Sequence, residues 1–86
     1  MAWYIYMLRC KDGTLYTGMT DNVEKRFAAH TAGKGAKYTR GRGPVALRYW
    51  ELCASGTHAR KREVEIKRLP RAKKMALIAE KAEASG

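Results

Sequence analysis

The chain has 86 residues, of which 45% are hydrophobic and 30% are charged. Domains usually contain about 50 to 250 residues, so residues 1–86 are expected to form a single domain with one core. Lys and Arg number 18 against 8 Asp and Glu, which gives a net charge of +10. This imbalance indicates a polyanion as partner, and nucleic acid ranks ahead of a solvated basic surface or an anionic membrane. The sequence has no apolar run long enough to span a bilayer.

The two cysteines and the N-terminus carry little functional signal. Cys10 and Cys53 form neither a disulfide framework nor the paired spacing of a zinc site. Residues 1–6 lack the basic, apolar and small-residue pattern of a signal peptide. We therefore expect a cytoplasmic protein whose cysteines are small strand residues.

Residues 3–19 predict a β-hairpin. Residues 3–8 are aromatic, β-branched or apolar, and an Asp-Gly turn at 12–13 separates them from a second strand that begins near residue 15. Side chains alternate between the two faces of a strand, so Tyr6 and Tyr16 can converge on one face.

A helix of about ten residues is expected next. Asp21 and Glu24 form a capping-box pattern, and the helix is expected to end near Gly33. Arg26 and His30 are four residues apart, so they lie one above the other and form one patch.

The segment from Gly33 to Pro44 is expected to be a loop, because it has four glycines and almost no residue to bury. Glycine lets the backbone approach a ligand closely, and interleaved basic and aromatic residues suit phosphate contact or base stacking. By composition alone, a merely solvated basic loop has equal weight. The residues expected to contact nucleic acid are Lys34, Lys37, Tyr38, Arg40 and Arg42.

The rest of the chain predicts one strand and two helices. Residues 45–52 alternate and form a third strand, while Thr57 is expected to cap a helix that runs through Leu69. Pro70 is expected to open a third helix through about Ala82. The predicted fold is α+β, with a three-stranded, mainly antiparallel sheet flanked by three helices.

Glu63 interrupts the core-facing stripe of the second long helix, between Ala59 and Ile66. An unpaired buried charge costs on the order of several kcal/mol, so the position requires a cation. From the residues alone that cation is either an arginine, such as Arg62 or Arg26, or a metal ion.

Taken together, these residues resemble the GIY-YIG endonuclease superfamily. Tyr4-Ile5-Tyr6 precedes Tyr16-Thr17-Gly18 by about ten residues, as in the paired motif, and Arg26, His30 and Glu63 follow in the expected order. The resemblance runs from Trp3 to Ile78 and is closest to a small stand-alone bacterial branch. That branch is matched further by Leu15 to Gly18, Thr39-Arg40 and Lys73-Lys74-Met75-Ala76-Leu77-Ile78.

The resemblance implies hydrolysis of DNA phosphodiester bonds. It places the motif tyrosines on Tyr6 and Tyr16, the arginine on Arg26, the histidine on His30 and the metal-binding glutamate on Glu63. It implies that one Mg²⁺ or Mn²⁺ on Glu63 polarises the phosphate, that Arg26 stabilises its charge, and that Tyr6, assisted by His30 or Tyr16, takes a proton from water. A free tyrosine has a pKa of about 10, so metal and arginine charges would have to lower it. We expect the five side chains to cluster on one side of the sheet.

Two departures from the motif keep other interpretations open. Tyr4 occupies the position of the first motif glycine, where packing is its expected role, and Met19 replaces a lysine found in some repair nucleases. One alternative is a catalytically weak nucleic-acid-binding module of the same fold. Another is an RNA-associated basic protein, which leaves Glu63 unexplained. Substrate selection would come from the basic loop, from DNA shape or from a protein partner.

Overall fold

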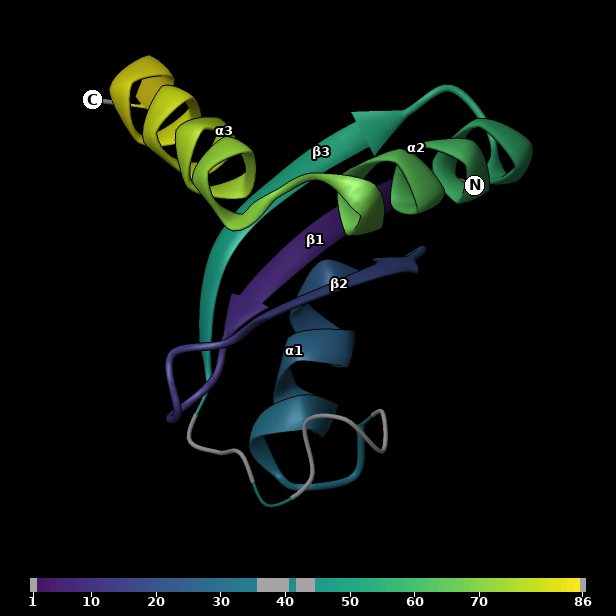
Figure 1. Ribbon diagram of the computed structural model, residues 1–86. Helices are drawn as coiled ribbons and strands as arrows, with labels where there is room; N and C mark the ends of the chain where they lie inside the picture. The colour runs from purple at the N-terminus through teal and green to yellow at the C-terminus, as the bar shows by residue number, and fades with distance from the viewer. Residues whose placement is uncertain (1, 36–40, 42–44, 86) are drawn as a thin grey trace.

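The structure is a computed structural model that describes residues 2–35, 41 and 45–85. Its elements, in order, are β1 (Trp3–Arg9), β2 (Leu15–Thr20), α1 (Val23–Thr31), β3 (Ala46–Cys53), α2 (Gly56–Arg68) and α3 (Arg71–Ser85). Figure 1 shows one sheet with α1 on one side and α2 and α3 on the other. The expected α+β class, with three strands and three helices among the described residues, is confirmed.

The sheet has the strand order β2-β1-β3, and both pairings are antiparallel. The predicted hairpin and its pairing with the third strand are therefore confirmed. Because β1 is central, Tyr6 lies opposite Gly18 on one side and opposite Trp50 on the other. A register shift follows Met7, where β1 pairs with β3.

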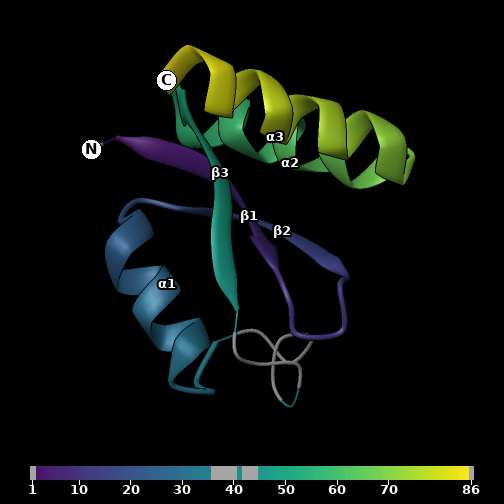
Figure 2. The same ribbon diagram turned by 90° about the vertical axis from the view of Figure 1, so that its left-hand side faces the viewer.

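Alternation along β1 divides its side chains between two layers. Ile5 and Met7 are fully buried against α2 and belong to the main core. The other buried members of that core are Tyr49, Cys53, Ala59 and Ile66. Tyr6, between Ile5 and Met7, therefore points to the opposite face, which α1 covers. Figure 2 shows the same layers turned by 90°, with α2 and α3 together on one side of the sheet.

The helix starts differ from the predicted positions by one or two residues. Asn22, not Asp21, caps α1, and its side chain accepts a hydrogen bond from a backbone N–H at 3.1 Å. Ser55, not Thr57, caps α2 in the same way, also at 3.1 Å. In both cases a neighbouring residue is also a good capping residue, and composition does not reveal which one adopts the extended backbone that a cap requires. The third helix begins at Arg71, directly after Pro70.

Two further expectations concern the cysteines and the membrane. Cys10 and Cys53 are buried free thiols, Cys53 at the end of β3 and Cys10 directly after β1. Within the described part of the chain, every helix is too short or too polar to span a bilayer.

Candidate active site

Three aromatic rings from β1, β2 and α1 meet on the face that α1 covers. The Tyr6 hydroxyl lies 2.9 Å from Nε2 of His30, and the two residues are only 2% and 1% exposed. Tyr16 completes the triangle, with its ring centroid 6.3 Å from that of Tyr6 and 5.3 Å from that of His30. The structure thus brings together three of the five predicted site residues in direct contact.

Two glycines make room for this cluster. A Cβ added at Gly18, the last residue of the second motif, would lie 2.5 Å from the Tyr6 hydroxyl oxygen. A Cβ added at Gly35, just after α1, would collide with the His30 ring. Gly18 could be found from the motif. The role of Gly35 could not be predicted, because it depends on how the chain returns over His30.

Burial sets the protonation of this pair. It raises the pKa of Tyr6, and although an interaction with Arg26 lowers that pKa in part, the charges of Tyr16 and Glu63 raise it further. Arg26 alone therefore does not provide the lowering that a tyrosine base requires. Burial, followed by the charge of Arg26, lowers the pKa of His30. His30 is consequently neutral at pH 7, and in the tautomer protonated at Nδ1 its Nε2 accepts a hydrogen bond from the Tyr6 hydroxyl.

Arg26 lies one helical turn before His30 and faces the Tyr6 oxygen. It also lines a hollow of about 220 Å³ at the start of α1, together with Thr20, Asp21, Asn22, Lys25 and Ala29. Its two cationic side chains outnumber the single carboxylate of Asp21, and with a hydroxyl and an amide beside them they make this hollow suitable for a phosphate group.

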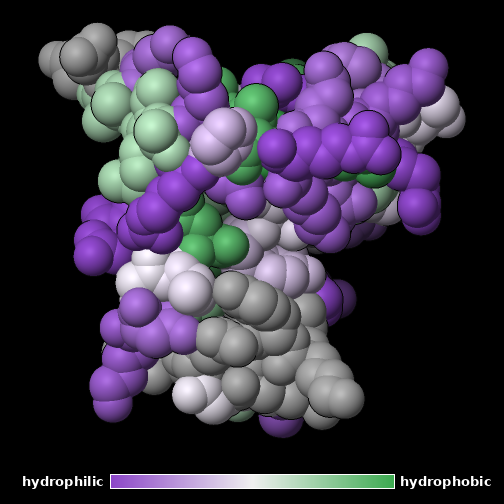
Figure 3. Space-filling view, viewed as in Figure 1, coloured by the Kyte–Doolittle hydropathy of each residue, from purple (hydrophilic) through white to green (hydrophobic). Residues whose placement is uncertain are grey.

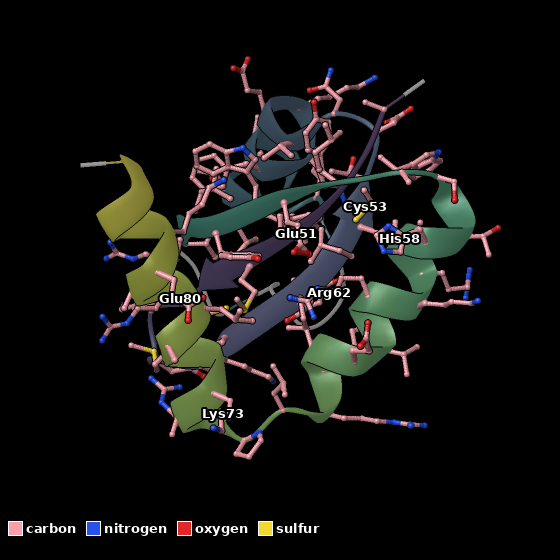
Figure 4. The ribbon with its side chains drawn as sticks, turned by 90° about the horizontal axis from the view of Figure 1, so that it is seen from above. Glu51, Cys53, His58, Arg62, Lys73 and Glu80 are labelled. Carbon is pink, nitrogen blue, oxygen red and sulfur yellow. The ribbon has the colours of Figure 1, made fainter. Side chains whose placement is uncertain are left out.

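Glu63 lies on α2, and its side chain is 18% exposed. Ala59 and Ile66 of the same stripe are fully buried, so the expected core-facing position is confirmed in part. The neighbouring cation is Lys67, whose Nζ lies 3.4 Å from Oε2 of Glu63. The expectation of an arginine partner is wrong for Arg62, which binds Glu51 of β3 instead (Figure 4).

The expected placement of all five residues on one side of the sheet is also wrong, because α2 packs on the face opposite α1 (Figure 1). The Glu63 carboxylate nevertheless acts on Tyr6 electrostatically. The Tyr6 hydroxyl lies directly beside the backbone of Gly18, in edge strand β2. We infer that the candidate site spans this edge strand. Alternation predicts the face of a strand residue, but it does not predict the side on which a later helix packs.

A metal ion at this site would have one carboxylate ligand from the chain. Among the described residues no three His, Cys, Asp or Glu side chains form a group that could hold a metal ion. Mg²⁺ commonly binds through one or two carboxylates and completes its shell with water and substrate phosphate oxygens. A half-buried Glu63 fits that mode of binding, whereas the described part of the chain offers no closed cage of protein ligands.

The predicted nucleic-acid contacts lie mostly beyond the described residues. Lys34 is exposed just after α1. The other four, Lys37, Tyr38, Arg40 and Arg42, fall outside the described ranges, so their contact with nucleic acid stays a prediction. Figure 3 shows hydrophilic residues covering α2, whereas hydrophilic and hydrophobic residues alternate over α3.

Comparison with known proteins identifies the family. The GIY-YIG catalytic domain family matches residues 2–76. The chain is 55% identical over 78 residues to a UPF0213 protein of Clostridium perfringens, covering 91% of this chain and 84% of that protein. A UPF0213 protein of Natronomonas pharaonis is 58% identical over 77 residues, covering 90% and 91% of the two chains.

A solved structure agrees with these matches. The solution NMR structure of a UPF0213 protein from Bacillus halodurans has a TM-score of 0.60 and 48% identity, and the match covers 92% of this chain and 84% of that one. The GIY-YIG domain family consists of nucleases, which act on DNA. The chain therefore belongs to the GIY-YIG family, and its relatives are the UPF0213 proteins.

Proposed function

We propose that the chain is a metal-dependent DNA endonuclease of the cytoplasm that hydrolyses phosphodiester bonds during DNA repair or recombination. The observation that supports this most is the buried hydrogen bond of 2.9 Å between Tyr6 and a neutral His30, beside Arg26. A phenol paired with a neutral imidazole can pass a proton on, which is what activation of water requires.

The proposed reaction moves one proton through this pair. A water oxygen attacks phosphorus and its proton passes to the Tyr6 oxygen, while the Tyr6 proton passes to Nε2 of His30. The new P–O bond forms as the bond to the leaving oxygen breaks, and the leaving oxygen takes a proton from solvent. Because Tyr6 never has to exist as a free phenolate, its raised pKa is compatible with this role.

Two charged residues would supply the remaining chemistry. The Arg26 guanidinium, beside the Tyr6 oxygen, would stabilise the negative charge that develops on the phosphate. Glu63 would hold one Mg²⁺ or Mn²⁺, and when bound this ion supplies Lewis-acid polarisation of the phosphate and stabilises the leaving oxygen.

Two observations favour a second candidate, a nucleic-acid-binding module with weak cleavage. Lys67 already neutralises the Glu63 carboxylate at 3.4 Å, and a metal ion would have to displace it. Met19 contributes no cation where some repair nucleases have a lysine. The two candidates differ in cleavage and agree in DNA binding.

The deciding experiment is a cleavage assay on duplex, single-stranded, flapped and branched DNA, with Mg²⁺, with Mn²⁺ and with a chelator. The variants are Glu63→Gln and, as a matched control, Glu65→Gln, which changes an exposed carboxylate two residues along the same helix. We expect Glu63→Gln to lose cleavage by about 100-fold or more while DNA affinity and melting temperature stay near wild type. Glu65→Gln should cleave normally.

Each other outcome has a definite meaning. If the wild type binds all four substrates but cleaves none of them, the second candidate, a nucleic-acid-binding module with weak cleavage, is favoured. Full activity of Glu63→Gln, or cleavage that survives the chelator, would contradict the proposed metal role. A loss of stability by a few kcal/mol in Glu63→Gln, with activity falling only as the protein unfolds, would identify Glu63 as a structural residue instead of a metal ligand.

A further inference from the structure

A second and larger cavity lies beside the candidate site, and the proposed mechanism does not use it. It has a volume of about 420 Å³, within the range of about 300 to 1,000 Å³ typical of small-molecule sites. We call it the aromatic pocket, and its main lining residues are Tyr4, Asp21, Val23, Glu24, Leu47 and Trp50.

The aromatic pocket adjoins the residues proposed to cut DNA. Tyr4 lies two residues before Tyr6 and on the same face of β1, and Trp50 is the partner of Tyr6 across the sheet. Asp21 and Asn22 line both the aromatic pocket and the hollow that contains Arg26. The two cavities therefore meet at the start of α1.

The two cavities differ in chemistry. The hollow beside Arg26 is lined by two cations, Arg26 and Lys25, and by one carboxylate, Asp21, so its excess of positive charge attracts phosphate. The aromatic pocket shares Asp21 and adds Glu24, with no cation among the described residues that line it, so its excess of negative charge repels phosphate. A DNA strand whose phosphate lies beside Arg26 would therefore place a chemical group other than a phosphate in the aromatic pocket.

A nucleobase fits that pocket. Every base has a flat face that stacks on aromatic side chains, and carboxylates accept hydrogen bonds from the amino groups of bases. The Trp50 indole is 43% exposed, and Lys81 of α3 lies 4.4 Å from its ring centroid, which restrains the ring's orientation. A base inside an intact duplex cannot reach such a pocket unless it leaves the stack.

We propose that the aromatic pocket binds one unstacked nucleobase of the strand whose phosphate lies beside Arg26. This inference rests on the proposed function and names its substrate class, which is DNA with a single-stranded or extruded nucleotide at the site of cutting. Because the two ionised carboxylates accept hydrogen bonds and donate none, a base whose exocyclic amino group donates hydrogen bonds binds better than thymine. Continuity with the Arg26 hollow favours a base over the other occupant of suitable charge, a basic side chain of a partner protein.

The test measures binding without requiring cleavage. The background protein carries Glu63→Gln, to prevent cutting, and Trp3→Phe, which leaves Trp50 as the only tryptophan. It is titrated with single-stranded oligonucleotides of cytosine, adenine or thymine and with an abasic oligonucleotide of equal length. We expect the cytosine and adenine oligonucleotides to quench Trp50 emission and to bind at least several-fold more tightly than the abasic one.

Substitutions then locate the effect. Trp50→Ala should weaken binding of the cytosine oligonucleotide by about 5- to 150-fold and leave the abasic affinity unchanged, while Trp50→Phe should restore most of the loss. Leu52→Ala is the matched control, because Leu52 belongs to the same strand, points to the same face and is 64% exposed, yet does not line the pocket. It should bind all oligonucleotides normally.

The outcomes separate this inference from the proposed function. The proposal that the aromatic pocket binds a base is wrong if no oligonucleotide changes Trp50 emission, or if Trp50→Ala binds base-containing and abasic strands with the affinities of the background protein. A basic side chain of a partner protein then becomes the favoured occupant. If the wild type fails to cleave any DNA while Trp50 emission still distinguishes base-containing from abasic strands, the nuclease proposal fails and the proposal for the aromatic pocket stands.

Discussion

Tyr6 and His30 are polar residues in a nearly solvent-free environment, and each satisfies the other. A buried hydroxyl or imidazole without a partner costs about 1–3 kcal/mol, so their bond of 2.9 Å stabilises the fold as well as preparing a proton path. The neighbours of the pair impose its protonation state, because burial disfavours both phenolate and imidazolium.

The lowered pKa of His30 predicts how stability depends on pH. The unfolded chain takes up a proton on His30 near its ordinary pKa of 6.5, whereas the folded chain does so only at lower pH. The unfolded state therefore binds more protons below about pH 7, and the free energy of unfolding falls as pH falls through 6.5 toward the folded pKa. Cleavage by the folded protein should decline only at lower pH, around the lowered pKa of His30, because a protonated His30 cannot accept the Tyr6 proton.

Urea denaturation between pH 5 and 8 measures this effect. His30→Gln should flatten the pH dependence of the denaturation midpoint. His58→Gln, which changes the only other histidine of the chain, should retain it. A His30→Gln protein with the full pH dependence would show that other groups cause it.

At the scale of elements, the position of α2 matters most, because this helix carries Glu63. Nε of Arg62 lies 2.8 Å from Oε1 of Glu51, and the Tyr49 hydroxyl donates to Oε2 of Glu51 at 3.2 Å. Figure 4 shows Glu51 of β3 and Arg62 of α2 pointing toward one another. The carboxylate of Glu51 raises the pKa of Arg62 above its ordinary value. This network joins α2 to β3 at the residue next to Glu63.

We predict that Glu51→Ala lowers the free energy of unfolding by about 1–2 kcal/mol, because the network is only 25–30% exposed and one residue supports two hydrogen bonds. Lys67→Ala should change it by no more than about 0.5 kcal/mol, because the Lys67 side chain is 52% exposed and its pair with Glu63 is an i,i+4 contact on one helix. Urea denaturation measures both variants. Equal effects would mean that the network does not anchor α2.

The elements themselves were largely predictable, and their ends and packing sides were not. A run of aromatic, β-branched and apolar residues followed by an Asp-Gly turn specifies the hairpin, and apolar residues at helical spacing specify α2. The caps at Asn22 and Ser55 compete with equally suitable neighbours at Asp21 and Thr57. The cation beside Glu63 was missed because Lys67, four residues further along the helix, occupies a position where the sequence pattern predicts an ordinary exposed lysine.

At the scale of the whole molecule, the central strand β1 positions residues on both faces of the sheet. Alternation on β1 sends Ile5 to the core and Tyr6 to α1, and β2 forms the edge beside which the Tyr6 hydroxyl lies. The motif spacing predicts that Tyr6, Tyr16 and His30 belong together. It does not predict the aromatic pocket, because Trp50 reaches it only through the pairing of β1 with β3.

The net charge of +10 predicts DNA binding that weakens steeply with salt. Changing Lys37 and Arg40 together to Ala should weaken binding to all sequences and reduce the slope of log affinity against log salt by about two, because each neutralised phosphate contributes about 0.9. Filter binding at several salt concentrations measures this. The control changes Arg71 and Lys73 of α3, which lies on the face opposite α1. Unchanged affinity and slope in the Lys37 and Arg40 variant would exclude the loop from the interface.

The most direct test of the proposed chemistry is the single-turnover cleavage rate of Tyr6→Phe, measured together with its melting temperature. The substitution removes only the oxygen that lies 2.9 Å from Nε2 of His30, and the ring can remain packed beside Tyr16 and Gly18. We predict a cleavage rate lower by about 100- to 10,000-fold, the usual contribution of a positioned proton-transfer group, in a protein that still folds and binds DNA. A folded Tyr6→Phe protein that cleaves at the wild-type rate would contradict the account.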